Sequence, residues 1–382
     1  MAEWKAKPAI RFAGFTDAWE QRKLGEVTKS YSGGTPSVGR AEYYGGSIPF
    51  IRSAEINSDT TALFITVSGL NSSSAKMVNV GDILYALYGA TSGEVGISRI
   101  YGAINQAILA INPESEYDSQ FLMQWLRHEK QNIIMTFLQG GQGNLSGAIV
   151  KDLLIKFPPT YEEQKKIGLF FAVIDHLITL HQREYAKTVS MKKALLEKMF
   201  PKNGYNKPDI RFNGFTDAWE QRKAIDIAPL QRGFDLPKNN MKDGEYPVVM
   251  SNGINGYHSE FKAKAPGVVT GRSGTIGKLH YIGENFWPHN TSLWVTDFKG
   301  NVPLYVYYMY QLLDLSQYGT GSGVPTLNRN DVHDAKIYIP RPEEQTKISE
   351  FFRSIDNLIT LHQRELNKLQ NMKKALLEKM FV

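Results

Sequence analysis

The chain has 382 residues, of which 42% are hydrophobic and 21% are charged, and its formal net charge is +6. This length suggests two domains, or three, and the ordinary composition excludes a disordered or fibrous protein. The sequence contains no cysteine, which excludes disulfides, thiolate zinc sites, cysteine nucleophiles and cysteine-ligated iron–sulfur clusters. No apolar run approaches the roughly 20 residues that span a bilayer, and the N-terminus, MAEWKAKPAIRF, has no apolar signal core. We therefore expect a cytoplasmic protein without a membrane partner, and the mild positive charge permits a nucleic-acid partner without requiring one.

The predicted elements follow the same order twice along the chain. Short β-rich runs separated by glycine and asparagine come first, then a helix, and then a long helical segment without proline. The first set comprises strands at 48–52 and 82–88, a helix at 119–138 and a long helix at 162–199. The second set comprises strands at 267–270 and 292–296, a helix at 303–315 and a long helix at 343–380. Because strands and helices do not alternate regularly, we expect an α+β fold rather than a doubly wound parallel sheet.

Two pairs of near-identical segments frame these elements. The head segments at 7–23 (KPAIRFAGFTDAWEQRK) and 207–223 (KPDIRFNGFTDAWEQRK) differ at two of 17 positions. The helical segments at 174–200 and 355–381 match at 21 of 27 positions. A framework that is repeated while the inserts vary indicates one docking chemistry and two recognition chemistries. By the same equivalence, we expect the C-terminus of the chain to lie close to the first head.

The inserts at 24–161 and 224–342 diverge except for a sparse skeleton. We match Ser92–Gly96 (SGEVG) with Ser273–Gly277 (SGTIG), and Asn105 with Asn290. The recurring S-G-x-x-G turn predicts shared phosphate positioning in both domains.

The two long helices carry an apolar stripe that recurs every three or four residues. In the second copy, Ile348, Ile355, Leu369 and Leu376 keep a seven-residue register, which is typical of a coiled-coil-like seam. We expect each helix to pair with its own copy; the alternative is that each packs only on its own domain. The expected stripe also includes Leu177, Met191, Leu358 and Met372. The matched lysine pairs at 192–193 and 373–374 are predicted to be exposed docking residues, or else a merely solvated helix face.

No catalytic motif is complete. The run GRSGTIGK at 271–278 is one residue too long for a P-loop and lacks the hydroxyl residue after its lysine. The run FPPTY at 157–161 lacks the polar first residue of an amino-methyltransferase motif. The nuclease-like Pro208-Asp209 is not repeated at Ala9, and the eight histidines form no metal-binding spacing. These observations favour a binding subunit over an enzyme, with no catalytic residue, metal or cofactor.

The repeated blocks resemble the specificity subunit of type I restriction–modification systems. The resemblance covers essentially the whole chain and rests on the twin FxGFTDAWEQRK heads and the twin EEQ…FF…ID…LITLHQRE…KKALLEKMF helices. It also includes PGVVTGRSGTIG at 266–277, WPHNT at 287–291 and GSGVPTLNRN at 321–330. The resemblance implies target recognition domains at 1–161 and, after a linker, at 201–342, with spacer helices at 162–200 and 343–382. It further implies that the helices are antiparallel and pseudo-twofold.

In that family each recognition domain reads one half of an asymmetric, bipartite site in double-stranded DNA. The helices dock two DNA methyltransferase subunits, which direct adenine methylation, and a restriction subunit (nuclease and translocase) can join them. Donors and acceptors in glycine-bounded loops are the groups that such readout needs. The predicted DNA-binding residues are Thr35, Ser37, Arg40, Arg52, Tyr88, Thr91, Ser92, Asn105, Gln106, Gln142, Asn144, Arg232, Asn252, Asn255, Arg272, Ser273, His289, Asn290, Thr291, Asn328 and Arg329.

Two alternatives remain at this point. A sugar-binding or structural scaffold explains the repeated helices but not the divergent inserts. A self-sufficient methyltransferase or nuclease is opposed by the missing motifs. Many of the predicted polar residues could also serve only to stabilise turns.

Overall fold

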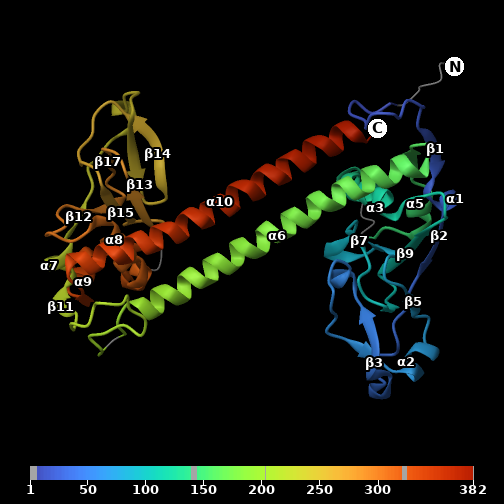
Figure 1. Ribbon diagram of the computed structural model, residues 1–382, viewed down its shortest axis with the longest axis horizontal. Coiled ribbons are helices and arrows are strands. Elements are labelled where there is room, and N and C mark those ends of the chain that lie inside the picture. Colours follow the sequence, from blue (N-terminus) through green and yellow to red (C-terminus); the bar gives the residue numbers. More distant parts are fainter. Residues whose placement is uncertain (1–6, 139–143, 203, 321–324, 382) are drawn as a thin grey trace. The chain divides into compact units, whose positions relative to one another are not determined.

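The computed structural model describes residues 7–138, 144–202, 204–320 and 325–381 (Figure 1). Contacts divide the chain into two compact units, one formed by residues up to 181 and from 365 onward, the other by residues 182–364. Each unit therefore contains one globular domain and a part of both long helices. Gln142 and parts of both glycine-rich loops, at 140–143 and 319–323, lie outside the described residues. No helix among the described residues is long and apolar enough to cross a membrane.

The first unit builds a small domain from two four-stranded sheets. The sheets have the orders β2-β9-β6-β7 and β4-β3-β8-β5, and β1 pairs separately with β10. The strands are β1 (Glu20–Lys23), β2 (Thr28–Ser32), β3 (Tyr44–Ile51), β4 (Phe64–Ile65), β5 (Lys76–Val78), β6 (Ile83–Ala86), β7 (Val95–Ile97), β8 (Gly102–Ile104), β9 (Ile108–Pro113) and β10 (Leu154–Phe157). The helices are α1 (Leu24–Val27), α2 (Val67–Asn71), α3 (Ser119–His128), α4 (Lys130–Phe137), α5 (Gly147–Lys151) and the long α6 (Tyr161–Met199), with short 3-10 turns η1 (Ala41–Tyr43), η2 (Ser53–Glu55) and η3 (Gly89–Thr91).

The second unit repeats this plan with different strand lengths. Its main sheet has the order β12-β18-β15-β16, a second sheet the order β14-β13-β17, and β11 pairs with β21 as β1 does with β10. The strands are β11 (Glu220–Lys223), β12 (Leu230–Arg232), β13 (Tyr246–Met250), β14 (Gly253–His258), β15 (Gly267–Gly271), β16 (Leu279–Ile282), β17 (Trp287–Pro288), β18 (Ser292–Val295), β19 (Gly319–Thr320), β20 (Thr326–Leu327) and β21 (Lys336–Ile339). The helices are α7 (Ala224–Ile227), α8 (Pro303–Leu312), α9 (Arg329–His333) and the long α10 (Pro342–Met380), with 3-10 turns η4 (Lys238–Asn240) and η5 (Leu315–Tyr318).

The α+β class predicted from the sequence is confirmed. The predicted strands at 48–52, 82–88, 267–270 and 292–296 fall on β3, β6, β15 and β18. The helix predicted at 119–138 is two helices, because the chain turns at Glu129, which ends α3 and precedes α4. The domain boundaries expected from the sequence remain a proposal.

Each head segment is attached to the start of its own long helix. Arg11 donates two hydrogen bonds to the buried carboxylate of Glu163, with N–O distances of 2.6 and 2.8 Å. In the second unit Arg211 holds Glu344 in the same way, at 2.7 Å for both bonds. Two of the repeated motifs, the IRF of the head and the EEQ of the helix, therefore occur together because they bind each other.

The two long helices pack antiparallel within each unit. In the first unit Phe171 stacks on Phe381, and Asp175 accepts a hydrogen bond from Lys373 at 2.6 Å. In the second unit the equivalent residues are paired, Phe352 with Phe200 and Asp356 with Lys192, the latter also at 2.6 Å. This equivalence confirms a pseudo-twofold repeat with paired helices.

Part of the predicted seam is wrong. Leu177, Met191, Leu358 and Met372 are 37–46% exposed, whereas Lys373 is only 9% exposed. The lysines at 192 and 373 occupy seam positions because an aspartate on the facing helix neutralises each one. Lys192 and Lys373 are therefore not available as exposed docking residues.

The C-terminus lies against the first head, as the repeat predicts. The backbone N–H of Ile10 donates to the carbonyl of Lys379 at 2.9 Å. The equivalent bond in the second unit runs from Ile210 to Lys198, also at 2.9 Å. Phe381 packs beside Trp19 in the core of the first unit, as Phe200 does beside Trp219 in the second.

Candidate nucleic-acid interface

A group of loops at the carboxyl ends of β2, β3, β6 and β8 brings many of the predicted residues of the first domain together. We call residues 33–37, 52–55, 87–93, 105–107 and 144 the first loop cluster. Backbone hydrogen bonds join these loops: Asn105 donates to Ile51, Leu87 to Ala107, and Gly34 to Ile104, at 3.3, 2.8 and 3.2 Å. These bonds satisfy backbone donors within the cluster and hold its loops together.

The second domain has the same arrangement. We call residues 232–235, 251–252, 272–277, 289–291 and 326–328 the second loop cluster. His289 donates to Val249 at 2.9 Å and Arg272 to Thr291 at 2.9 Å. Gly233 donates to Ser292 at 3.1 Å, and its counterpart Gly33 donates to Ile108 at 3.4 Å. Any Cβ added at Gly33 or Gly233 would overlap a carbonyl oxygen of the neighbouring loop, so only glycine fits there.

These bonds correct the sequence alignment of the two inserts. Asn105 is equivalent to His289 rather than Asn290. Asn105 donates from its backbone to Ile51, the last residue of β3 that pairs with β8, and His289 donates to Val249, the last residue of β13 that pairs with β17. Gln106 is therefore the counterpart of Asn290. Leu87 is the counterpart of Arg272, because the carbonyl of Leu87 accepts from the backbone N–H of Leu145 and the carbonyl of Arg272 accepts from that of Leu327.

Backbone hydrogen bonds also show that the predicted match between the two S-G-x-x-G motifs is wrong, because it pairs residues that are not structurally equivalent. Gly93 donates to Ala86, and Gly277 donates to Gly271, which makes these two glycines equivalent. Each turn contains two glycines at positive φ, but they are four residues apart in the first domain (Gly89, Gly93) and three apart in the second (Gly274, Gly277). Ser92 is buried and donates to the carbonyl of Leu87 at 3.3 Å, which is a turn-stabilising role.

The predicted residues of the first domain that the structure describes, all but Arg40 within the first loop cluster, make different contacts. Thr35 hydrogen-bonds Gln106 on the adjoining loop. Tyr88 bridges to Asn144 through its backbone and accepts from the hydroxyl of Thr91. Three residues are placed differently from these: Arg52 pairs with Glu55, Arg40 pairs with Glu42, and Ser37 lies exposed just before η1.

Glu55 anchors the loop after β3. Burial alone would raise the pKa of this carboxyl, but hydrogen bonds from the side chain and backbone of Arg52, from Ala62 and from Thr61 lower it to about 2. The carboxylate therefore stays ionised and keeps Arg52 engaged at 2.8 Å. This contact holds Arg52 within the first loop cluster.

In the second loop cluster the side chains make more contacts with each other. Arg232 and Asn290 both donate to Oδ1 of Asp235, the first at 2.8 Å. His289 Nδ1 lies 3.0 Å from the hydroxyl of Thr291, and burial lowers the pKa of His289, which favours the neutral ring. Asp235 was not among the predicted residues; its spacing of three from Arg232 was the available signal.

Of the remaining predicted residues of the second domain, Asn255 and Arg329 lie outside this cluster and the others belong to it. Arg272 and Ser273 are half-buried, and Ser273 bridges to Thr326. Asn252 accepts from Lys278 through its carbonyl at 3.1 Å, and Asn255 donates to the sulfur of Met250 at the start of the β14 hairpin. Asn328 caps α9 by accepting from Asn330, and exposed Arg329 begins that helix.

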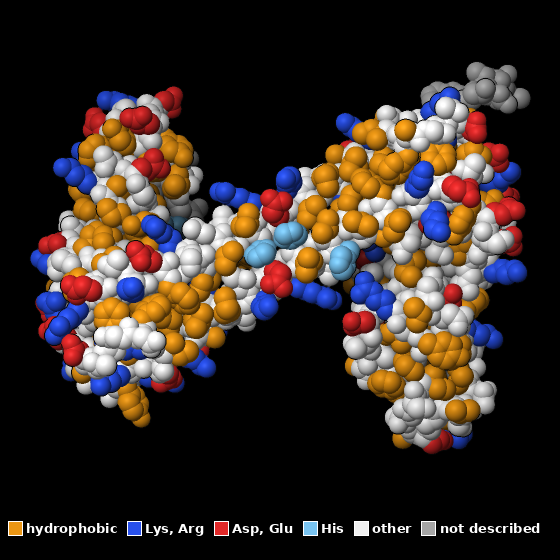
Figure 2. Space-filling view, in the orientation of Figure 1, with side chains coloured by type: hydrophobic (Ala, Val, Ile, Leu, Met, Phe, Trp, Pro, Cys, Tyr) orange, Lys and Arg blue, Asp and Glu red, His pale blue; other side chains and the backbone are white. Residues whose placement is uncertain are grey.

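The charge distribution contains no single-sign field on the face drawn in Figure 2, where basic and acidic side chains are interspersed. Among the described residues, no group of three or more histidines and carboxylates is placed to hold a metal ion.

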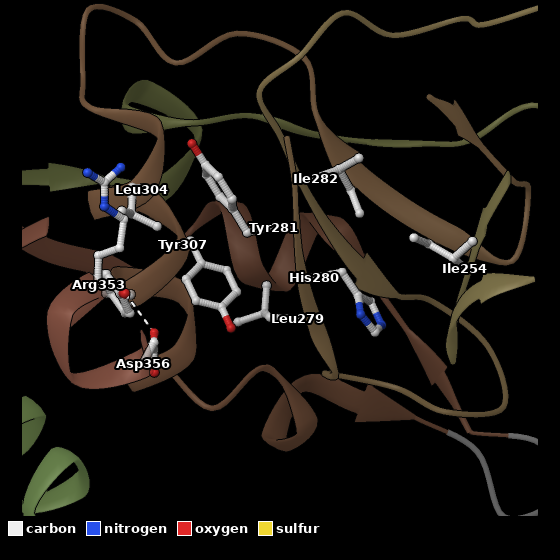
Figure 3. A pocket seen from close by; sticks show the side chains of 10 residues that line it. Ile254, Leu279, His280, Tyr281, Ile282, Leu304, Tyr307, Arg353 and Asp356 are labelled. Carbon is white, nitrogen blue, oxygen red and sulfur yellow. Dashed lines mark hydrogen bonds between the residues drawn. The ribbon is translucent and has the colours of Figure 1, made fainter. Parts of the chain in front are cut away.

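The second unit contains a cavity of about 520 Å³ (Figure 3). It is lined by aromatic and aliphatic side chains from β16 and α8 and by Arg353 and Asp356 of α10. Asp356 is already engaged by Lys192 at 2.6 Å and by the hydroxyl of Tyr308 at 2.7 Å. Burial lowers the pKa of His280, which favours its neutral form. This cavity is a junction between domain and helix rather than a set of converging catalytic groups.

Comparison with known proteins assigns the family. The model of the "Type I restriction modification DNA specificity domain" matches residues 16–188 and 216–371. The MjaVIII specificity subunit of Methanocaldococcus jannaschii, a type I restriction enzyme component, is 20% identical and covers 94% of this chain and 91% of its own. The type I restriction–modification S subunit from M. genitalium superposes with a TM-score of 0.73 at 15% identity over 99% of both chains. A chain from a study of complex assembly and conformational transition of the type I R-M system gives a TM-score of 0.53 at 14% identity, over 96% of this chain and 98% of its own.

The chain therefore belongs to the family of type I restriction–modification DNA specificity proteins.

Proposed function

We propose that this family member is the non-catalytic specificity subunit of a type I restriction–modification enzyme, in which each domain reads one half of a bipartite, asymmetric site in double-stranded DNA. The observation that carries the proposal is the pair of loop clusters. An equivalent set of backbone hydrogen bonds supports both, yet the side chains displayed at equivalent positions differ. A framework of this kind supports one mode of DNA contact with two different base sequences.

Equivalent positions show how the two half-sites would differ. Two residues after the equivalent glycines Gly33 and Gly233, Thr35 is replaced by Asp235, and Tyr88 is replaced by Ser273. Side chains of different donor and acceptor pattern select different base edges in the major groove. Two non-identical half-sites make the whole target asymmetric.

The long helices are the proposed docking surfaces for two DNA methyltransferase subunits. Leu177 and Leu180 of α6 are 37% and 46% exposed, and their repeat counterparts Leu358 and Leu361 of α10 are 46% and 52% exposed. Large apolar side chains that stay exposed in both copies are typical of a binding surface. Because the exposed leucines are duplicated, the same kind of partner would bind twice.

Catalysis would then belong to the partners. The methyltransferase subunits would modify adenine, and a restriction subunit could join the same assembly. The specificity subunit would determine which adenines are reached.

The proposal is tested by mapping methylated adenines in DNA from cells with and without this gene, in the presence of its methyltransferase. We expect one asymmetric bipartite motif that disappears with the gene. A variant with Arg272→Ala should weaken specific binding by about 1–3 kcal/mol if the guanidinium contacts a base. Methylation that does not change on deletion of the gene would instead favour the scaffold alternative.

A further inference from the structure

We propose that Asp235 is a base-reading residue that accepts a hydrogen bond from the exocyclic amine of cytosine or adenine in the half-site of the second domain. This inference rests on the proposed function. Asp235 lies in the second loop cluster, three residues after the end of β12, and its side chain is 64% exposed.

The position of Asp235 is equivalent to that of Thr35 in the first domain. Gly33 and Gly233 begin the two loops and make equivalent backbone bonds, to Ile108 and Ser292. Two residues later, Thr35 bonds Gln106 and Asp235 bonds Asn290, and these two amides are themselves equivalent. Each domain therefore has a hydrogen-bonded pair of side chains at the same position of the shared backbone framework. The two pairs differ chemically.

The hydrogen bonds of Asp235 leave one acceptor free. Arg232 and Asn290 both donate to Oδ1. No described residue donates to Oδ2, so this oxygen remains available to a ligand. An ionised carboxylate only accepts hydrogen bonds, and its ligand must therefore be a donor.

The donor requirement selects among the four bases. In the major groove, cytosine N4 and adenine N6 are donors, whereas guanine presents O6 and N7 and thymine presents O4 as acceptors. A carboxylate near DNA phosphates is otherwise repelled, and Arg232 at 2.8 Å reduces that repulsion without removing the free acceptor. A carboxylate at this position thus rejects guanine and thymine and admits cytosine or adenine.

The first domain lacks this restriction. Thr35 and Gln106 each carry both donor and acceptor capacity, so the equivalent base of the first half-site is selected differently. Asp235 would therefore act on one base position in one half of the target.

The test selects binding sequences from randomised double-stranded DNA with the full chain assembled with its methyltransferase. The variants are Asp235→Asn, which keeps the shape and adds a donor, and Asp235→Thr, which installs the residue of the first domain. The matched control is Asp297→Asn, because Asp297 is also exposed and pairs with Lys299 at 2.8 Å in the loop after β18. We expect both Asp235 variants to lose roughly 5- to 150-fold of the discrimination at one position of the second half-site. The first half-site and the control should not change.

Three outcomes would count against the inference. An unchanged consensus in both Asp235 variants would remove Asp235 from base reading. Uniform weakening on all sequences, with an unchanged consensus and a smaller salt dependence, would show that Asp235 only orients Arg232 toward phosphate. A native assembly that selects no sequence at all would overturn the proposed function itself, whereas a native consensus that the variants leave intact would overturn only the role of Asp235.

Discussion

Arg11 and Glu163 are joined by two parallel charge-assisted hydrogen bonds, although 152 residues separate them in the chain. The side chains are 11% and 1% exposed, so the pair is shielded from solvent. The carboxylate also lies in the first turn of α6, where negative charge is favoured by the helix dipole. This contact fixes the head segment to the long helix and explains why both motifs recur in the second unit.

Replacing Glu163 by glutamine should destabilise the first unit by about 3–5 kcal/mol, because it leaves the Arg11 charge buried without a counterion. The same change at Glu344 should affect the second unit similarly through Arg211. The measurement is the urea midpoint of the full chain. Arg22→Ala is the control, since Arg22 pairs with Glu20 at 2.7 Å but both side chains are at least half exposed, and it should lower stability by less than about 1 kcal/mol. Equal effects for Glu163→Gln and the control would contradict the buried-pair interpretation.

The contact between Asp175 and Lys373 predicts which of the two residues contributes more to the stability of the chain. Asp175 also accepts from Gln124 at 2.6 Å and Arg127 at 2.9 Å, so it keeps partners when Lys373 is lost. Lys373 has only Asp175 as a carboxylate partner among the described residues, and burial already lowers its pKa. Asp175→Ala should therefore destabilise the chain more than Lys373→Met, by about 1 kcal/mol or more. The reverse order in thermal or urea unfolding would show that the lysine, not the aspartate, is the central group of this contact.

The exposed leucines predict the number of methyltransferases bound. Leu177→Asp should reduce the assembly from two methyltransferase subunits to one, and the double variant with Leu358→Asp should abolish docking. Native mass spectrometry at fixed methyltransferase concentration measures this directly. Val189→Asp is a suitable control because Val189 is 40% exposed on the same helix but its repeat counterpart is Gln370. Retention of two subunits by the double variant would place the docking surface elsewhere.

Acid should weaken the loop after β3. The pKa of Glu55 is lowered in the folded chain to about 2 from an ordinary value of 4.5. A carboxyl with a depressed pKa contributes stability that is complete above about pH 4.5 and is lost as the pH falls toward 2. The free-energy difference between the native chain and Glu55→Gln should therefore be constant from pH 7 to about 5 and shrink below that. A difference that does not depend on pH between 5 and 3 would contradict this assignment.

The sequence predicted the repeated framework better than the recognition surface. The long helices were found to within a residue at their N-termini because apolar periodicity continues without proline, and the closing contact of Ile10 with Lys379 followed from repeat equivalence. The loop alignment failed because a one-residue difference in turn length is invisible when only the letters S, G and G match. A positive-φ glycine and a backbone bond, as at Gly93 and Gly277, define equivalence where side chains have diverged.

Buried lysine was missed for a related reason. A lysine in a helix is usually exposed to solvent, and Lys373 can be buried only because an aspartate on the facing helix pairs with it. Such a partner comes from a segment 198 residues away in the chain. Local periodicity contains no information about it.

The last prediction concerns the half-chain of residues 1–206. In the first unit, α6 and the domain core pack on Lys373, Leu376, Leu377, Met380 and Phe381 of α10. The half-chain lacks these residues but contains their repeat counterparts, Lys192, Leu195, Leu196, Met199 and Phe200, which are identical in type. A second half-chain can therefore supply every one of these contacts, including the bond from Lys192 to Asp175.

Without that partner, Ile167, Phe171 and Ile174 would be exposed to water. The free-energy cost is up to about 1.5–3 kcal/mol for each fully buried side chain. We therefore expect the half-chain to form a twofold homodimer with an isologous interface. Two identical recognition domains would then convert the asymmetric target into an inverted repeat of the first half-site. Supplied with the methyltransferase, the half-chain should methylate such palindromes, which sequencing of modified adenines would reveal, and sedimentation would give its mass. A folded half-chain that stays monomeric at high concentration, or a dimer that still modifies the asymmetric site, would show that the repeat is not interchangeable in this way.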